Sequence, residues 1–147
     1  MGRTLVNLKK AKKVLEKFFT DYDLDVEYVL SDEKLSAKSA NVSAKPYDDD
    51  IYLGIHVYSS GITTFNFIFD YLQKTSQALD LVNDFNEHVF ALKASISEDG
   101  GLTICHEAEV VDENILDVVA SRVLNNVIDD DTVKYLLPLT KLTAPKD

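Results

Sequence analysis

Residues 50–69 are DIYLGIHVYSSGITTFNFIF, and they have the pattern of two β-strands joined by a short turn. In the first strand, Asp50 to Tyr58, branched aliphatic residues alternate with aromatic residues, a glycine and a histidine, as expected when successive side chains point to opposite faces. The turn residues Ser59-Ser60-Gly61 follow, and a second β pattern runs from Ile62 to Phe69. The sequence therefore predicts an antiparallel hairpin.

Both faces of this hairpin are partly apolar. One face of the second strand carries three phenylalanines, and the other carries Ile62 and Ile68 among polar residues. An antiparallel sheet with one face in water normally shows a cleaner alternation, so we expect apolar β surface that the helices must cover or leave to a partner. These aromatic residues are either core or part of a face that buries a partner segment or a second copy of this chain. The proposed surface is a sheet face or helix groove lined by some of Tyr52, His56, Tyr58, Phe65 and Phe67.

Further elements flank the hairpin on both sides. Apolar residues at spacings of three and four predict helices, and period-two alternation predicts strands. The expected elements are a helix over 4–22, a strand over 25–30, the hairpin over 50–69, a helix over 75–88, a second hairpin with strands over 90–96 and 102–110, and a helix from 112. A further turn or two of helix is expected over 132–137, before Pro138. This order, α-β-β-β-α-β-β-α, predicts an α+β fold with an antiparallel sheet of about five strands flanked by helices.

The 147 residues form one expected domain. Residues 31–50 are small and polar, with Ser-Ala repeated three times before Pro46, and they predict a long loop. A short edge strand around Val42 is the alternative, because a loop of this length is uncommon. Residues 143–147 are expected to be a loose tail.

Charge is unevenly distributed along the chain. The formal net charge is −10, which opposes direct binding to nucleic acid. Residues 1–20 nevertheless hold six basic residues and one acid. The basic side of the first helix is either a solvated face or a docking stripe for an acidic partner or membrane surface. Its residues are Lys9, Lys12, Lys13 and Lys17.

Several features indicate a cytoplasmic protein. No apolar stretch approaches the roughly 20 residues of a membrane span, and the N-terminal residues lack the apolar core of a secretory signal. A lone cysteine, Cys105, cannot form an intramolecular disulfide. Met1-Gly2 lacks the Ser or Thr at position 6 that myristoylation requires, because Val6 stands there.

We expect no metal site, cofactor or catalytic residue. Cys105 and His106 are adjacent on a predicted strand and so point to opposite faces, while His88 can interact with carbonyls at a helix C-terminus. The aspartate runs 48–50 and 129–131 lack the spacing of a calcium loop and are better explained as loop acids and helix caps. Common phosphate-binding and hydrolytic motifs are absent from the sequence.

Asn83 and Asn86 lie three residues apart on one side of the expected helix over 75–88. They are candidates for polar recognition of a ligand. The alternative is that one or both bridge the helix to a neighbouring loop by hydrogen bonds.

Residues 78–104, ALDLVNDFNEHVFALKASISEDGGLTI, combine a helix containing Leu81-Val82-Asn83-Asp84-Phe85-Asn86, an alternating strand, an acidic glycine turn and another apolar strand. This segment resembles the central part of the YbjN family of bacterial sensory transduction regulators. The resemblance implies the fold of type III secretion chaperones, which are small acidic proteins that bind other proteins and often dimerise.

The leading hypothesis is a non-catalytic protein-binding, chaperone-like or regulatory adaptor that binds a protein partner or forms a homodimer. A second hypothesis is an acidic mimic of nucleic acid that occupies a basic protein, because residues 21–147 hold 24 acidic and nine basic residues. A third is a small-ligand binder or enzyme whose site is assembled across elements.

Overall fold

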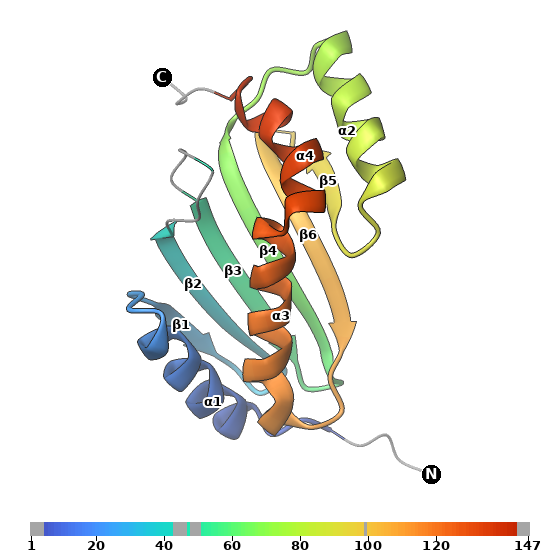
Figure 1. The fold of residues 1–147 in the computed structure, drawn as a ribbon. Helices are drawn as coiled ribbons and strands as arrows, with labels where there is room; N and C mark the ends of the chain where they lie inside the picture. Colours follow the sequence, from blue (N-terminus) through green and yellow to red (C-terminus); the bar gives the residue numbers. More distant parts are fainter. Residues whose placement is uncertain (1–4, 43–46, 48–50, 99, 144–147) are drawn as a thin grey trace.

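A computed structural model describes residues 5–42, 47, 51–98 and 100–143. The chain is an α+β protein with an antiparallel sheet. Its elements are α1 (Leu8–Asp21), β1 (Glu27–Leu30), β2 (Lys34–Val42), β3 (Ile51–Tyr58), β4 (Ile62–Tyr71), α2 (Ser76–His88), β5 (Lys93–Ile96), β6 (Gly101–Glu109), the short 3-10 helix η1 (Glu113–Ile115), α3 (Leu116–Ile128) and α4 (Asp130–Thr140) (Figure 1).

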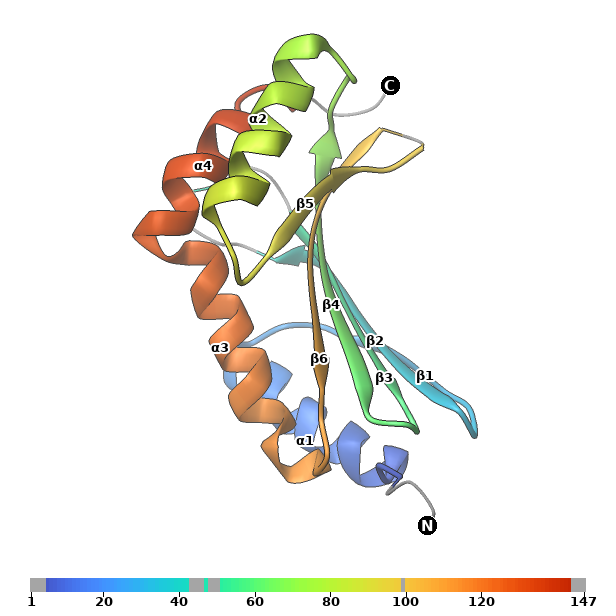
Figure 2. The same cartoon turned by 90° about the vertical axis from the view of Figure 1, so that its right-hand side faces the viewer.

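The described strands form one sheet of six, in the order β1-β2-β3-β4-β6-β5. All neighbouring strands pair antiparallel, and both predicted hairpins, β3 with β4 and β5 with β6, are confirmed. Figure 2, which turns the molecule by 90°, shows the four α-helices of the described chain gathered on one side of the sheet. The architecture is therefore two layers, with a helix layer on one sheet face.

The core lies between these two layers. Every second residue of β3, from Ile51 to Val57, is buried, and Phe65, Phe67 and Phe69 of β4 are at most 4% exposed. Period-two alternation sends these side chains to the helix layer, where close packing excludes water. The helices contribute their own apolar stripes, as predicted. In α1 the stripe is Leu8, Ala11, Leu15 and Phe18.

Polar side chains define where the helices begin. Asn7 accepts a hydrogen bond from the backbone N–H of Lys10 at the start of α1, and Thr75 does the same for Ala78 at the start of α2. Asp112 caps η1, which precedes α3, and Asp129 caps α4. These oxygens satisfy N–H groups that have no partner within the helix. For Asp129, the interpretation of the aspartate run as a cap is thus confirmed.

The prediction of a long loop over 31–50 is wrong for residues 34–42, which form the nine-residue strand β2. This strand is interior, since it pairs with β1 and β3. Leu35, Ala37 and Ser39 alternate toward the helix layer and are fully buried. The sequence signal was weak because two of these three buried residues are small. Residues 43–46 and 48–50 lie outside the described residues, as do 144–147 of the expected tail.

Element boundaries also differ from expectation. The sheet has six strands rather than about five because of β2. The aspartate run 129–131 interrupts the third helix, as expected, and the helical turns after it belong to α4. Helix α4 contains Pro138 in its last turn instead of ending before it. Strand β5 begins at Lys93 rather than at Phe90, whose side chain is 91% exposed. Among the described helices, not one has the length and apolar character needed to cross a membrane.

Two neighbouring residues of β4 test the two-layer arrangement. Phe67 is 2% exposed and Ile68 is 36% exposed. We expect Phe67→Ala to lower the free energy of unfolding by about 3–5 kcal/mol, because it leaves a cavity in the core. Ile68→Ala should cost about 1 kcal/mol or less. Urea unfolding of both variants measures this, and equal losses would show that the two faces of β4 are not differently packed.

Candidate functional site

The face of the sheet opposite the helix layer is the candidate functional site, and we call it the open face. Cross-strand pairing fixes its members, since directly opposed residues point to the same side. Its described side chains are Glu27 and Val29 of β1; Lys34, Ser36 and Lys38 of β2; Tyr52, His56 and Tyr58 of β3, with Gly54; Ile62, Thr64, Asn66 and Ile68 of β4; Thr103, Cys105, Glu107 and Glu109 of β6; and Lys93 and Ser95 of β5.

Apolar side chains on the open face are partly in contact with solvent. Tyr58, Ile62 and Ile68 are 36–39% exposed, and Val29 is 57% exposed. Tyr52, which lies directly opposite Ile68, is half-buried. The expectation that the helices leave apolar β surface uncovered is confirmed for the described part of the chain. Strand pairing places these residues on the face opposite the buried phenylalanines, and Figure 2 shows the helices on the other side of the sheet.

Gly54 lies at the centre of the open face beneath two neighbouring side chains. A Cβ atom at this position would lie 3.5 Å from Nε2 of His56 and 3.7 Å from the ring of Tyr52. The two rings therefore converge over the glycine and fill the space that a side chain would occupy. The absence of a side chain at Gly54 lets the rings of Tyr52 and His56, its neighbours two residues away on the same strand, pack against the backbone of the sheet.

His56 is tied to the neighbouring strand by a hydrogen bond. Its Nδ1 lies 2.9 Å from Oγ of Ser36. Partial burial lowers the pKa of His56 below its usual value of 6.5, and Lys34 and Lys38 lower it further. Serine beside histidine is a nucleophile and base combination. Ser36, however, is only 4% exposed, so its hydroxyl joins β2 to β3 rather than meeting a substrate.

Charged residues on the open face are arranged by strand. Lys34 and Lys38 lie on β2, whereas Glu107 and Glu109 lie on β6, which β3 and β4 separate from β2. The Nζ atom of Lys34 lies 5.8 Å from the ring centre of Tyr58. The outermost strands reverse this polarity, since β1 contributes Glu27 and β5 contributes Lys93. The described open face thus carries three lysines and three glutamates.

The proposed partner surface was wrong about Phe65 and Phe67. Both side chains point into the core, with exposures of 1% and 2%. Phe65 lies opposite His106 on the helix side, with ring centroids 6.1 Å apart. Alternation places them on the face opposite Tyr52, His56 and Tyr58, because β3 and β4 pair Ile55 with Phe65 and His56 with Thr64.

Cys105 and His106 point to opposite faces, as predicted. Cys105 lies on the open face opposite Asn66 of β4, and His106 bonds the carbonyl oxygen of Ala91 through Nδ1 at 2.7 Å. Partial burial raises the pKa of the Cys105 thiol, and Glu107 raises it further against the opposing effect of Lys93. The thiol is therefore a protonated, half-buried part of the open face.

Asn86 has a structural role that excludes ligand recognition. Its amide nitrogen donates to the carbonyl oxygen of Ala94 at 3.0 Å, and its amide oxygen accepts from the Ala94 N–H at 2.7 Å. The side chain thereby joins α2 to β5, so the expected bridging role is confirmed for this residue, although the bridged segment is a strand rather than a loop. Asn83 is exposed on α2 and remains a candidate for polar recognition.

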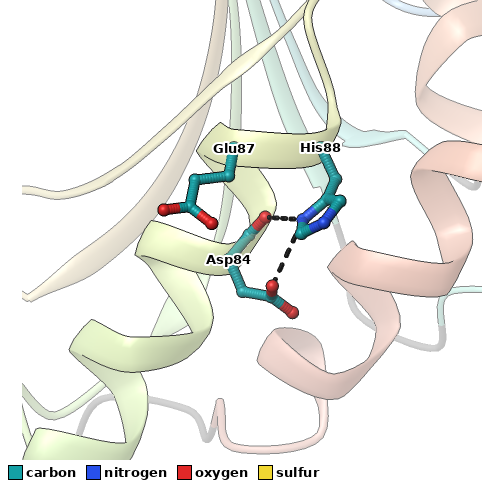
Figure 3. Close-up of side chains that lie close together, drawn as sticks. All are labelled: Asp84, Glu87 and His88. Carbon is teal, nitrogen blue, oxygen red and sulfur yellow. Dashed lines mark hydrogen bonds and ion pairs between the residues drawn. The ribbon is translucent and has the colours of Figure 1, made fainter.

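Asp84, Glu87 and His88 form a cluster at the end of α2 (Figure 3). Nδ1 of His88 lies 2.8 Å from the carbonyl oxygen of Asp84, which confirms the expected contact with a carbonyl near the helix C-terminus. The His88 ring also stacks on Tyr135 of α4, with centroids 4.6 Å apart. Ligand atoms of the three residues lie within 4.8 Å, but all three are exposed. These contacts explain His88 as a link between α2 and α4.

The basic side of α1 divides into two parts. Lys9, Lys13 and Lys17 are exposed and follow one another at four-residue intervals along the helix. Lys12 is half-buried, with its Nζ atom 5.4 Å from the ring centre of Tyr28 on β1. Lys12 therefore contributes to packing of α1 on the sheet.

A hollow of about 470 Å³ lies on the surface of α3, away from the open face. Its described lining residues all belong to α3 and include Asp117, Ser121 and Arg122. Tyr22, which follows α1, lies nearby, with its hydroxyl 3.3 Å from Oγ of Ser121. A hollow on the surface of one helix lacks the enclosing walls of a typical small-molecule site.

Comparison with protein-family models, curated proteins and solved structures finds no match for this chain. The site therefore rests on its own geometry. Of the predicted surface, Tyr52, His56 and Tyr58 are together on the open face. The sequence analysis missed the contributions of β2 and β6, although the period-two parity of β4 already separated Ile62 and Ile68 from the phenylalanines.

The lowered pKa of His56 predicts a pH-dependent stability. Well above pH 6.5 the imidazole is neutral in both the folded and the unfolded chain, so it adds no pH dependence there. As the pH falls below 6.5, the unfolded chain binds the proton first, and the free energy of unfolding decreases. We expect His56→Gln to lose less stability than the wild type between pH 7.5 and pH 5.5. Chemical unfolding at both pH values measures this, and parallel losses would contradict it.

Proposed function

We propose that this protein is a non-catalytic protein-binding module, of adaptor or chaperone type, that buries partner surface against its open face. The observation that carries the proposal is the position of Tyr58, Ile62 and Ile68, which are more than a third exposed on a sheet face without helices. Exposure of apolar groups to water is unfavourable in free energy, and association removes these groups from water. Polar groups lie between them, such as Thr64 and Asn66. Such a mixture is typical of binding surfaces on proteins that also exist without their partner.

The sheet edges are less suited to binding than the open face. An exposed strand edge can pair with another chain through its backbone. At β5 the amide of Asn86 already occupies the N–H and C=O of Ala94. At the other edge, β1 has only four residues and begins with Glu27. Short and charged or covered edges disfavour strand addition, so association through the face is favoured.

As part of this proposal, we assign the chain to the YbjN family and to the fold of type III secretion chaperones. The α+β element order and antiparallel sheet support them only at the level of fold class. A cytoplasmic location is likewise proposed, and the free thiol of Cys105 supports it.

The charge distribution does not favour the nucleic-acid mimic. Three lysines balance three glutamates on the described open face, so the net charge of −10 is carried elsewhere. A mimic would therefore use another surface.

Site-specific photo-crosslinking tests the proposal. A photoreactive phenylalanine analogue at Tyr58 should give covalent adducts with a protein in the native host, because this position faces the buried partner. The same analogue at Val118, which is 55% exposed on α3, is the matched control and should give few adducts. Equal yields at both positions would contradict a binding function of the open face.

A further inference from the structure

The open face is self-complementary, and we propose that it binds a second copy of this chain across a twofold axis between β3 and β4. This inference rests on the proposed function and names the partner. The axis runs close to the strand direction, in the plane between two stacked sheets. With the strand order β1-β2-β3-β4-β6-β5, a rotation of 180° about it places β3 over β4, β2 over β6 and β1 over β5.

Charge complementarity is the first argument. Lys34, Tyr58, Ile62 and Glu109 belong to one row across the sheet, because Lys34 pairs with Tyr58 and Ile62 pairs with Glu109. The rotation brings Lys34 of one copy over Glu109 of the other, and the symmetric contact repeats it. Opposite charges thus meet twice near the rim of the interface.

The outer strands show the same complementarity. Glu27 of β1 and Lys93 of β5 stand at the two ends of another row, which runs through Lys38, Gly54, Asn66 and Cys105. The rotation places Glu27 over Lys93. Lys38 faces the position of Cys105, next to Glu107 on the same strand. Each strand that carries a lysine is therefore matched with a strand that carries a glutamate.

Apolar and neutral groups match across the same axis. Tyr52 lies directly opposite Ile68 in the sheet, so the rotation places the tyrosine of each copy over the isoleucine of the other. Tyr58 and Ile62 exchange in the same way at the turn end of the hairpin. Between these two apolar pairs, His56 faces Thr64, both of which are half-buried and polar. A surface that matches itself under a twofold rotation is what an isologous dimer requires.

The size of the face agrees with a dimer interface. Six strands about 4.8 Å apart and central strands of about eight residues give a plane of roughly 600 Å². Its corrugated accessible surface approaches the roughly 800 Å² per partner of a standard interface. Stacked twisted sheets cross at about 30°, which displaces the rim contacts by about one residue. Lysine and glutamate side chains span such a displacement.

Reciprocal charge reversal tests the arrangement. The wild type should dimerise at micromolar concentration in sedimentation equilibrium. The variant Lys34→Glu/Lys38→Glu places acids over acids and should raise the dimer dissociation constant at least about tenfold. Glu107→Lys/Glu109→Lys places bases over bases and should do the same. Mixing these two variants should restore association as a heterodimer, because both contacts become attractive again.

A matched control separates this effect from net charge. Lys13→Glu/Lys17→Glu changes the total charge by the same amount as the first variant, but on the exposed side of α1. It should dimerise like the wild type, and circular dichroism should show all variants folded. A monomeric wild type, or two folded reversal variants that fail to associate when mixed, would overturn the inference. If the wild type is monomeric while Tyr58 crosslinks to a different protein, only the self-association falls, whereas an absence of open-face adducts as well removes the proposed function.

Discussion

A sheet has two faces, and the physical constraint on this protein is that its described helices cover only one of them. The helix layer receives the largest apolar side chains, including Phe65 and Phe67, and buries them almost completely. The opposite face carries apolar groups interspersed with polar ones, and Tyr58, Ile62 and Ile68 are partly in contact with water. Burial on the helix side stabilises the folded chain. Because that core does not involve the open face, the open face remains available for association.

The open face is ordered by contacts within the chain before any partner arrives. Ser36 holds His56 in place from the neighbouring strand, and the rings of His56 and Tyr52 converge over Gly54. Side chains held in this way lose little conformational freedom on binding, which lowers the entropic cost of association. The amide of Asn86 meanwhile covers the backbone of β5 at the edge. Covering the edge directs association toward the face.

Much of the fold was predictable because its hairpins have clear alternation and its helices have capped starts. Strand β2 was missed because Ala37 and Ser39 are buried without being strongly hydrophobic. The role of Ser39 depends on the fold, since its hydroxyl donates a hydrogen bond to the carbonyl oxygen of Asp25. The assignment of Phe65 and Phe67 to the binding surface failed for a different reason. Strand pairing decides which face of β4 adjoins Tyr52, and alternation within a single strand does not give that register. The charge pattern of β2 and β6 could be recognised only from the strand order, which places these two strands on either side of the central pair β3 and β4.

The lone cysteine gives the most direct measurement of whether the open face is buried by protein. Cys105 lies half-buried on that face, directly opposite Asn66 on one neighbouring strand and Lys93 on the other. The rate of its reaction with a thiol reagent, measured at fixed pH over a range of protein concentration, reports how often the face is uncovered. We expect the rate constant to fall as the concentration rises into the micromolar range, because association covers the thiol. In this account, protein covers the open face. A rate constant that stays the same at every concentration, and also when a partner identified by crosslinking at Tyr58 is added, would contradict it.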